Sequence, residues 1–202
     1  MYTSGMGKRI DRRSRSANPA YHDQHRYEHW LVDNQVYFIT ARCRNRRHCF
    51  ASDCAKEVFW DRFTHWTSIY GFVPWVTSLI DNHYHTLGYL KESKGLPELM
   101  RRFHGSVAKL TNDTLKDRHV PFWREAWGKQ YFDGCIRDET QARRAFRYTL
   151  TQSVRHGLVQ DWRKYPHTRV NVELERAIKR AQELKGFLEG VPYKRYLDGR
   201  RS

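Results

Sequence analysis

Apolar residues follow two different periods along this chain, and the two periods predict strands and helices in turn. The segment VYFITARC at 36–43 is β-branched and aromatic, as strands are, whereas the next apolar residues, from Ala55 to Ile69, recur at steps of three and four. Strands are predicted at Val36–Cys43, Phe72–Ile80, His83–Leu90 and Tyr131–Ile136, and helices at Asp53–Tyr70, Leu96–Leu115, Glu139–His156 and Val172–Leu188.

The order of these elements predicts a mixed α+β fold. Strand and helix follow one another as β-α-β-β-α-β, which is the order of a ferredoxin-like sheet with its helices packed on one face. The helix at 139–156 and the last helix at 172–188 follow this unit as additions. We therefore expect a core domain over 30–165, a basic N-terminal arm over 1–29 and a C-terminal helical extension over 166–202.

The charge of the chain indicates a nucleic-acid partner. Lys and Arg number 37 against 22 Asp and Glu, a formal net charge of +15, and aromatic residues make up 14% of the chain. Basic, aromatic-rich domains are typical of nucleic-acid binding. We found no secretory signal, no apolar run long enough to span a membrane and no C-x-x-C pair, so a cytoplasmic protein with reduced cysteines and no membrane partner is expected.

Two histidines, His83 and His85, stand one residue apart at the start of a predicted strand. Alternate side chains of a strand share a face, so both imidazoles project to one side and Tyr84 to the other. Two imidazoles on one face can ligate a single metal ion. A His-x-His pair also occurs by chance, and alone it is a weak signal.

The helix predicted at 139–156 presents a second group of chemically active residues. At 100° per residue, Ala142 and Phe146 lie on the packing side, and Tyr148 lies opposite them. Gln152 follows one turn later on the side of Tyr148, and Arg144 and Arg155 share that stripe. A phenol flanked by an amide and two guanidinium groups is a suitable neighbour for a phosphate group.

Together, the two elements predict phosphodiester chemistry. His83, His85 and the Gln152 amide oxygen could hold Mg²⁺ or Mn²⁺ and leave positions open for a phosphodiester. Tyr148 would then attack phosphorus, form a covalent phosphotyrosine and release a 3′-hydroxyl.

These residues resemble those of a known family. His83-Tyr84-His85 resembles the His–bulky apolar–His ("HUH") signature of single-tyrosine transposases, and 148–152 resembles their nucleophile helix, in which Gln or Asn follows the Tyr by four residues. The residues from Arg147 to Val159 are similar to the "RYI…NPVRAGLV" block of REP-associated tyrosine transposases, with Gln152-Ser153 in place of Asn-Pro, and Pro121 to Gly134 has a counterpart in their Trp-rich lead-in. The resemblance covers about 30–165 and implies a ferredoxin-like fold, a divalent metal and cleavage of single-stranded DNA at or near hairpins.

Further basic and aromatic residues are candidates for DNA contact. Trp123 and Trp127 lie in an irregular segment and could stack an unpaired base, although most Trp residues belong to cores. The arginine candidates are Arg42, Arg44, Arg46 and Arg47 after the first strand, Arg101 and Arg102 on the second helix, and Arg144 and Arg155 beside the tyrosine.

Two alternatives remain open at this point. The first is a domesticated DNA hairpin-binding protein that no longer cuts, and the second is a replication initiator of the same chemistry, which would need a helicase for which the chain has no room. A monomer is slightly favoured over a homodimer that exchanges its tyrosine helices.

Overall fold

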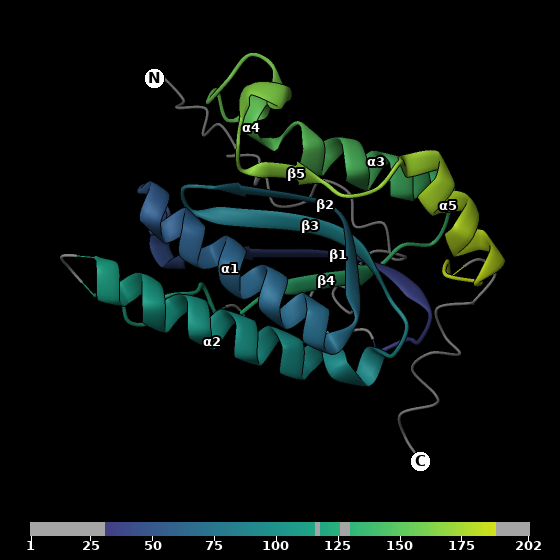
Figure 1. Ribbon diagram of the computed structural model, residues 1–202, viewed down its shortest axis with the longest axis horizontal. Helices are drawn as coiled ribbons and strands as arrows, with labels where there is room; N and C mark the ends of the chain where they lie inside the picture. The colour runs from purple at the N-terminus through teal and green to yellow at the C-terminus, as the bar shows by residue number, and fades with distance from the viewer. Residues whose placement is uncertain (1–30, 116–117, 126–129, 189–202) are drawn as a thin grey trace, which may run out of the picture.

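A five-stranded antiparallel sheet forms the centre of the molecule, with helices on both of its faces (Figure 1). The structure is a computed structural model that describes residues 31–115, 118–125 and 130–188. The strands lie in the order β4-β1-β3-β2-β5, and their bounds are β1 Gln35–Arg42, β2 Phe72–Ile80, β3 His83–Leu90, β4 Phe132–Cys135 and β5 Thr168–Val170.

Helices α1 (Asp53–Tyr70) and α2 (Leu96–Thr114) cover one face of this sheet. The Ser52 hydroxyl begins α1 by accepting the Ala55 N–H at 3.2 Å, and Gly71 ends it at a φ of +67°, where a side chain would be strained. The apolar sides of α1 and α2 pack with the sheet into an aromatic core that includes Phe59, Phe103 and Tyr84.

Helices α3 (Glu139–Leu150), α4 (Gln152–Arg155) and α5 (Leu174–Glu183) lie on the opposite face (Figure 1). The Asp138 carboxylate caps α3 by accepting the Gln141 N–H at 2.7 Å. A second core joins these helices to the sheet, with Leu87 of β3, Phe146 of α3 and Ile178 of α5 among its buried residues. The helix that carries Tyr148 is thereby fixed against the strand that carries the two histidines.

The four predicted strands and the first two helices are present within a few residues of their expected bounds. The predicted helix at 139–156 is instead broken at Thr151, whose backbone leaves the helical region at φ −92° and ψ 12°. The C-terminal helix is shorter than predicted, and the three-residue strand β5 was not predicted. β5 pairs with β2, so residues after 165 extend the same sheet.

Short 3₁₀ turns connect several of these elements: η2 Arg44–Arg46, η3 Ser93–Gly95 and η4 Trp162–Lys164. The N-terminal arm at 1–29 lies outside the described residues, as does Trp127. In the part of the chain that is described, no helix is long and apolar enough to cross a bilayer.

Candidate active site

The two histidines lie on the sheet face that α3 and α4 cover. Their rings are 5.1 Å apart between centroids, and both side chains are buried. Tyr84, between them, points into the opposite core, where its hydroxyl lies 2.9 Å from Nε2 of His104. Strand alternation therefore separates the imidazole pair from the aromatic core, as expected from the sequence.

Both imidazoles are neutral at physiological pH. Burial, followed by the positive charge of Arg42, lowers the pKa of His83 to about 3. Burial and the neighbouring His83 lower the pKa of His85 to about 2. The Nδ1–H of His83 donates to the Asn82 side-chain oxygen at 2.6 Å, which leaves the Nε2 lone pair available to a cation.

Gln152 is fully buried, and neither its amide oxygen nor its amide nitrogen has a hydrogen-bond partner. Nδ1 of His85 and the hydroxyl of Ser153 are also buried and unpartnered. Buried polar atoms normally find partners, so a cluster of unpaired ones indicates a missing ligand or ion. The residues four before and four after Gln152 each touch the histidine pair: Tyr148 contacts His85 with 5.1 Å between ring centroids, and His156 contacts His83 at 5.0 Å.

This donor set fits a divalent metal. Two neutral imidazoles and an amide oxygen are ligands that Mn²⁺ or Mg²⁺ accepts when water and phosphate complete the coordination. No group of three His, Cys, Asp or Glu side chains suited to a metal occurs among the described residues, and the amide of Gln152 is the candidate third ligand beside the two histidines.

Tyr148 and Gln152 lie one helical turn apart and differ in exposure. On a straight helix the two side chains would share one face, as the sequence suggested. Tyr148 is 45% exposed and Gln152 is 0% exposed, although backbone hydrogen bonds from Thr151 to Arg147 and from Arg155 to Thr151 continue the helical course through this point. Tyr148 and His156, one turn to either side of Gln152, both contact the histidine pair, so the buried amide lies on the same side of this segment.

Tyr148 is held in place from two sides. Its ring meets the edge of Phe38 at 6.2 Å and lies against His85. The guanidinium of Arg155 stands 3.6 Å from the centre of the same ring and donates to the Tyr148 carbonyl oxygen at 2.9 Å. An exposed phenol is thereby fixed beside both a cation and the histidine pair.

A cleft of about 380 Å³ opens beside Tyr148 and is rich in arginine. Arg143 forms ion pairs with Glu139 and Glu175. The other cationic residues of the cleft have no ion pair with any described carboxylate, and they are Arg144, Arg147 and Arg155. Unpaired guanidinium groups beside a phenol form an anion-binding surface.

Arg42 also reaches the site, from the end of β1, where it pairs in register with His83. Burial, followed by the charges of Arg46 and Arg124, lowers its pKa. Arg46 and Arg44 are exposed on η2, which follows β1 directly, and Arg47 at the end of that turn lies 3.5 Å from Nδ1 of His119. This turn therefore extends the basic surface along the edge of the site.

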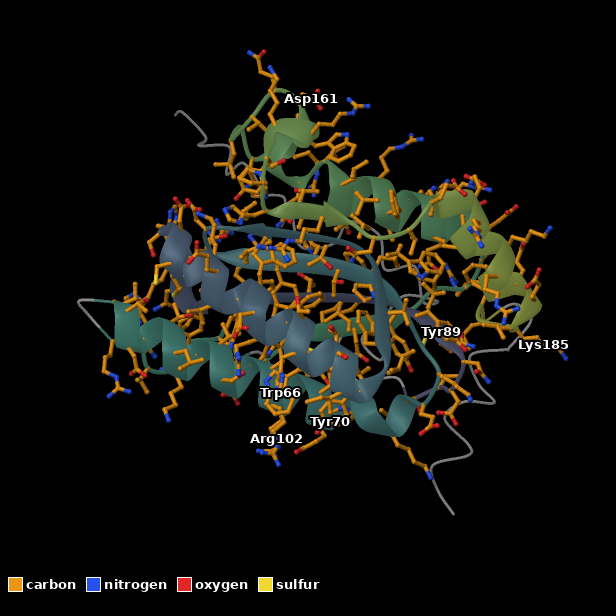
Figure 2. The ribbon with its side chains drawn as sticks, viewed as in Figure 1. Trp66, Tyr70, Tyr89, Arg102, Asp161 and Lys185 are labelled. Carbon is orange, nitrogen blue, oxygen red and sulfur yellow. The ribbon has the colours of Figure 1, made fainter. Side chains whose placement is uncertain are left out.

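Three predicted DNA contacts do not join this surface. Arg101 and Arg102 lie on α2, across the sheet from the histidines, where both bind Glu98 and Arg102 also stands over Trp66 (Figure 2). Trp123 is 2% exposed, stacks on His104 at 4.3 Å and donates its indole N–H to the His104 carbonyl oxygen. The prediction that Trp123 stacks a base was wrong, because this indole belongs to the core.

Three residues at the site were missed from the sequence: His156, Arg124 and Arg147. His156 follows Gln152 by four residues, a spacing that could have placed it one turn further along the same segment. Arg147 immediately precedes the tyrosine, and it too could have been considered. For Arg124, which donates its backbone N–H to the Arg42 carbonyl oxygen at 2.7 Å, no local sequence signal exists.

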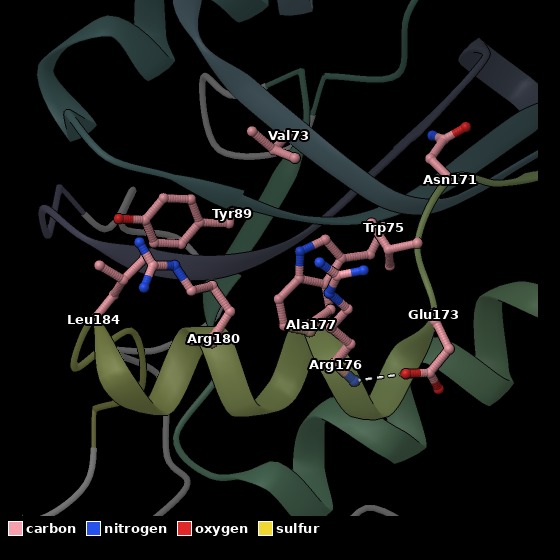
Figure 3. A pocket seen from close by; sticks show the side chains of 11 residues that line it. Val73, Trp75, Tyr89, Asn171, Glu173, Arg176, Ala177, Arg180 and Leu184 are labelled. Carbon is pink, nitrogen blue, oxygen red and sulfur yellow. Dashed lines mark hydrogen bonds between the residues drawn. The ribbon is translucent and has the colours of Figure 1, made fainter.

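A separate groove of about 500 Å³ lies at the other end of the sheet, between β2, β3 and α5 (Figure 3). Trp75 and Tyr89 form its wall on the sheet side, and Arg176 and Arg180 project from α5. Tyr89 lies on the same strand and face as His85 but four residues further along, so this groove is distinct from the site at Tyr148.

The chain matches a known protein family over most of its length. A family model described as "Transposase IS200 like" matches residues 31–151, which is more than half of the 202 residues and contains His83, His85 and Tyr148. The chain belongs to the IS200-like transposases. Gln152 lies one residue beyond the matched segment, and no curated protein matches the chain.

One solved structure agrees with this assignment at the level of the fold. A REP-associated tyrosine transposase bound to a REP hairpin superposes with a TM-score of 0.59 at 17% identity, over 70% of this transposase and 80% of that chain. A protein of Deinococcus radiodurans described as a transposase gives a TM-score of 0.42 at 13% identity, over 66% and 96% of the two chains. The ferredoxin-like order of the central strands, β4-β1-β3-β2, accords with the predicted fold.

Proposed function

We propose that this transposase is a metal-dependent endonuclease and strand transferase for single-stranded DNA, acting at or near hairpins through a phosphotyrosine intermediate at Tyr148. The observation that carries the proposal is the contact between the exposed Tyr148 ring and the buried His85 ring, 5.1 Å between centroids. A nucleophile and a potential metal-binding pair are thereby close enough to act on one phosphodiester.

The charge around the tyrosine supports DNA as the substrate. The arginine cleft and the η2 turn flank Tyr148 with cations that have few carboxylate partners, and a phosphodiester strand carries one negative charge per nucleotide. The solved relative noted above is bound to a REP hairpin, which supports a hairpin as the DNA form recognised here.

In the proposed reaction, Oη of Tyr148 loses its proton and forms a bond to phosphorus while the bond from phosphorus to the 3′-oxygen breaks. The 3′-oxygen takes up a proton and leaves as a hydroxyl, and the 5′-phosphate remains on the tyrosine. The reverse attack by another 3′-hydroxyl rejoins a strand without ATP, because the phosphodiester is conserved in the protein–DNA link.

His83, His85 and Gln152 would hold the metal, which when bound supplies Lewis-acid polarisation of the phosphoryl oxygens. Arg155 lies over the phenol and stabilises negative charge there, and Arg42 adds a cation at the histidine end. Preorganised charge of this kind contributes several kcal/mol to transition-state stabilisation, about 3–4 kcal/mol for one well-placed donor. All of these groups come from one chain, so we expect the monomer to be active.

Substitution of the nucleophile tests the proposal. Wild-type protein, Tyr148→Phe and a control Tyr89→Phe are incubated with labelled hairpin DNA and Mn²⁺, then resolved on a denaturing gel. Tyr89 is a suitable control because its hydroxyl binds Asn34 at 2.8 Å at the far end of the same strand. We expect a covalent band for wild type and Tyr89→Phe only, and none after chelation of the metal.

Two results would count against the proposal. A covalent band of full intensity from Tyr148→Phe would remove this residue as the nucleophile. DNA binding without a covalent band from any variant would favour the non-cutting hairpin-binding protein instead.

A further inference from the structure

An apolar pocket of about 360 Å³ adjoins Tyr148 and has no part in the proposed chemistry. It lies between the edge strand β4 and helix α3, and it shares only Tyr148 and Arg144 with the arginine cleft. Its volume falls within the range of about 300–1,000 Å³ that is common for small-molecule sites.

Aromatic side chains dominate the walls of this pocket. Phe38 on β1 pairs in register with Gly134 on β4, and Phe132 pairs with Thr40, so both phenylalanines project from the same face of the sheet. Phe132 is 41% exposed and Tyr148 is 45% exposed. Ile136 and Ala145 complete the apolar lining, and Arg144 is its one charged member.

We infer that this pocket receives the unpaired base of a nucleotide next to the scissile phosphate, stacked on Phe132. The inference rests on the proposed function, since it is the phosphodiester at Tyr148 that brings its neighbouring bases to this position. Two nucleosides flank any scissile phosphate, and the base of each projects from the sugar–phosphate backbone. The arginine cleft suits phosphates, whereas an apolar, aromatic wall suits a base.

A phosphate would bind poorly in this pocket, because mostly apolar walls would remove its hydration and, of the lining residues, Arg144 alone carries a compensating charge. A base has a π-face that stacks on an exposed ring whatever its identity. Arg144 lies at the junction of pocket and cleft, where it can contact the phosphate that joins the two sites.

Abasic substrates test this inference. The cleavage position is first mapped on a labelled hairpin, and oligonucleotides are then made with an abasic residue on the 5′ or the 3′ side of the scissile phosphate. Single-turnover adduct formation and Kd are measured for wild type, Phe132→Ala and Phe132→Leu. Ile69→Ala is the matched control, because Ile69 is 56% exposed on α1, on the other face of the sheet.

One abasic position should weaken the reaction or the binding of wild type about fivefold to a hundredfold, as expected for the loss of one stacked base. Phe132→Ala should be weaker on intact DNA and should show little further loss at that position, whereas Ile69→Ala should behave like wild type. Phe132→Leu keeps the apolar bulk without the ring, so its rate and Kd on intact DNA should lie between those of wild type and Phe132→Ala.

The inference would be overturned if an abasic residue, at each of the two positions, weakened Phe132→Ala and wild type by the same factor. Failure of wild type to form any adduct would instead overturn the proposed function. In that case hairpin oligonucleotides with an abasic residue at each unpaired position in turn are compared by Kd, and a position at which wild type but not Phe132→Ala loses affinity still decides whether Phe132 contacts a base.

Discussion

Replacement of Gln152 by leucine should separate the structural and the metal-binding roles of this residue. The side chain is fully buried, and both polar atoms of its amide lack partners in the described structure. Most buried glutamines serve as hydrogen-bonding residues, and their replacement destabilises the fold. Here the amide makes no hydrogen bond to any described residue, so the opposite sign is expected.

The magnitude follows from the cost of the unpaired amide. A buried polar group without a partner costs about 1–3 kcal/mol, and leucine is apolar and of similar size. In metal-free buffer, Gln152→Leu should therefore unfold with a free energy about 1–2 kcal/mol higher than wild type. For a protein of this length, that corresponds to a rise in Tm of roughly 2–8 °C.

The assay is thermal or urea unfolding of both proteins, with chelator and with Mn²⁺. A ligand at a hundred times its Kd stabilises the native state by about 2.7 kcal/mol, so wild type should gain strongly from Mn²⁺ and the variant should gain little. A variant less stable than wild type in chelator would show that the amide supports the fold. An undiminished Mn²⁺ effect in the variant would show that Gln152 is not a ligand.

Two further predictions concern charge and pH. Arg155→Ala removes the guanidinium 3.6 Å from the centre of the Tyr148 ring, and the cleavage rate should fall about a hundredfold. The slope of log K against log salt concentration should become shallower by about one phosphate contact. An unchanged single-turnover rate would contradict this prediction. Burial lowers the pKa of His104 to about 3, against about 6.5 in the unfolded chain, so the unfolded state alone takes up a proton as the pH falls from 6.5 towards 3. This group should then lower the free energy of unfolding by up to about 1.4 kcal/mol for each pH unit. In denaturation measured across this pH range, the free energy of unfolding of His104→Gln should fall less steeply with pH. Equal slopes for His104→Gln and wild type would show that His104 is not the group responsible.

Elements with a strong local signal could be predicted from the sequence. The alternating strand at 83–90 placed both histidines on one face because a strand leaves no other choice. The cap at Asp138 and the apolar stripe of α3 likewise predicted Tyr148 off the buried side of the helix, and its ring is 45% exposed although it also contacts Phe38 and His85. These features depend on residues a few positions apart.

Features that depend on distant residues could not be predicted. Local helix periodicity does not show that Gln152 is fully buried while Tyr148, one turn earlier, is 45% exposed, because this difference depends on which other elements pack over each residue. Strand β5 is three residues long and is fixed by its pairing with β2, about ninety residues earlier. Trp123 lies in an irregular segment, and only its stacking on His104 shows that it is a core residue.

In the proposed reaction, Tyr148 forms a covalent bond to DNA beside a metal held by His83 and His85. Its most direct test is peptide mapping by mass spectrometry after wild-type protein has reacted with hairpin DNA in Mn²⁺. We expect one nucleotide-modified peptide, with the modification on Tyr148, and no modified peptide in chelator. A modification on another residue, or on Tyr148 at the same yield in chelator, would contradict it.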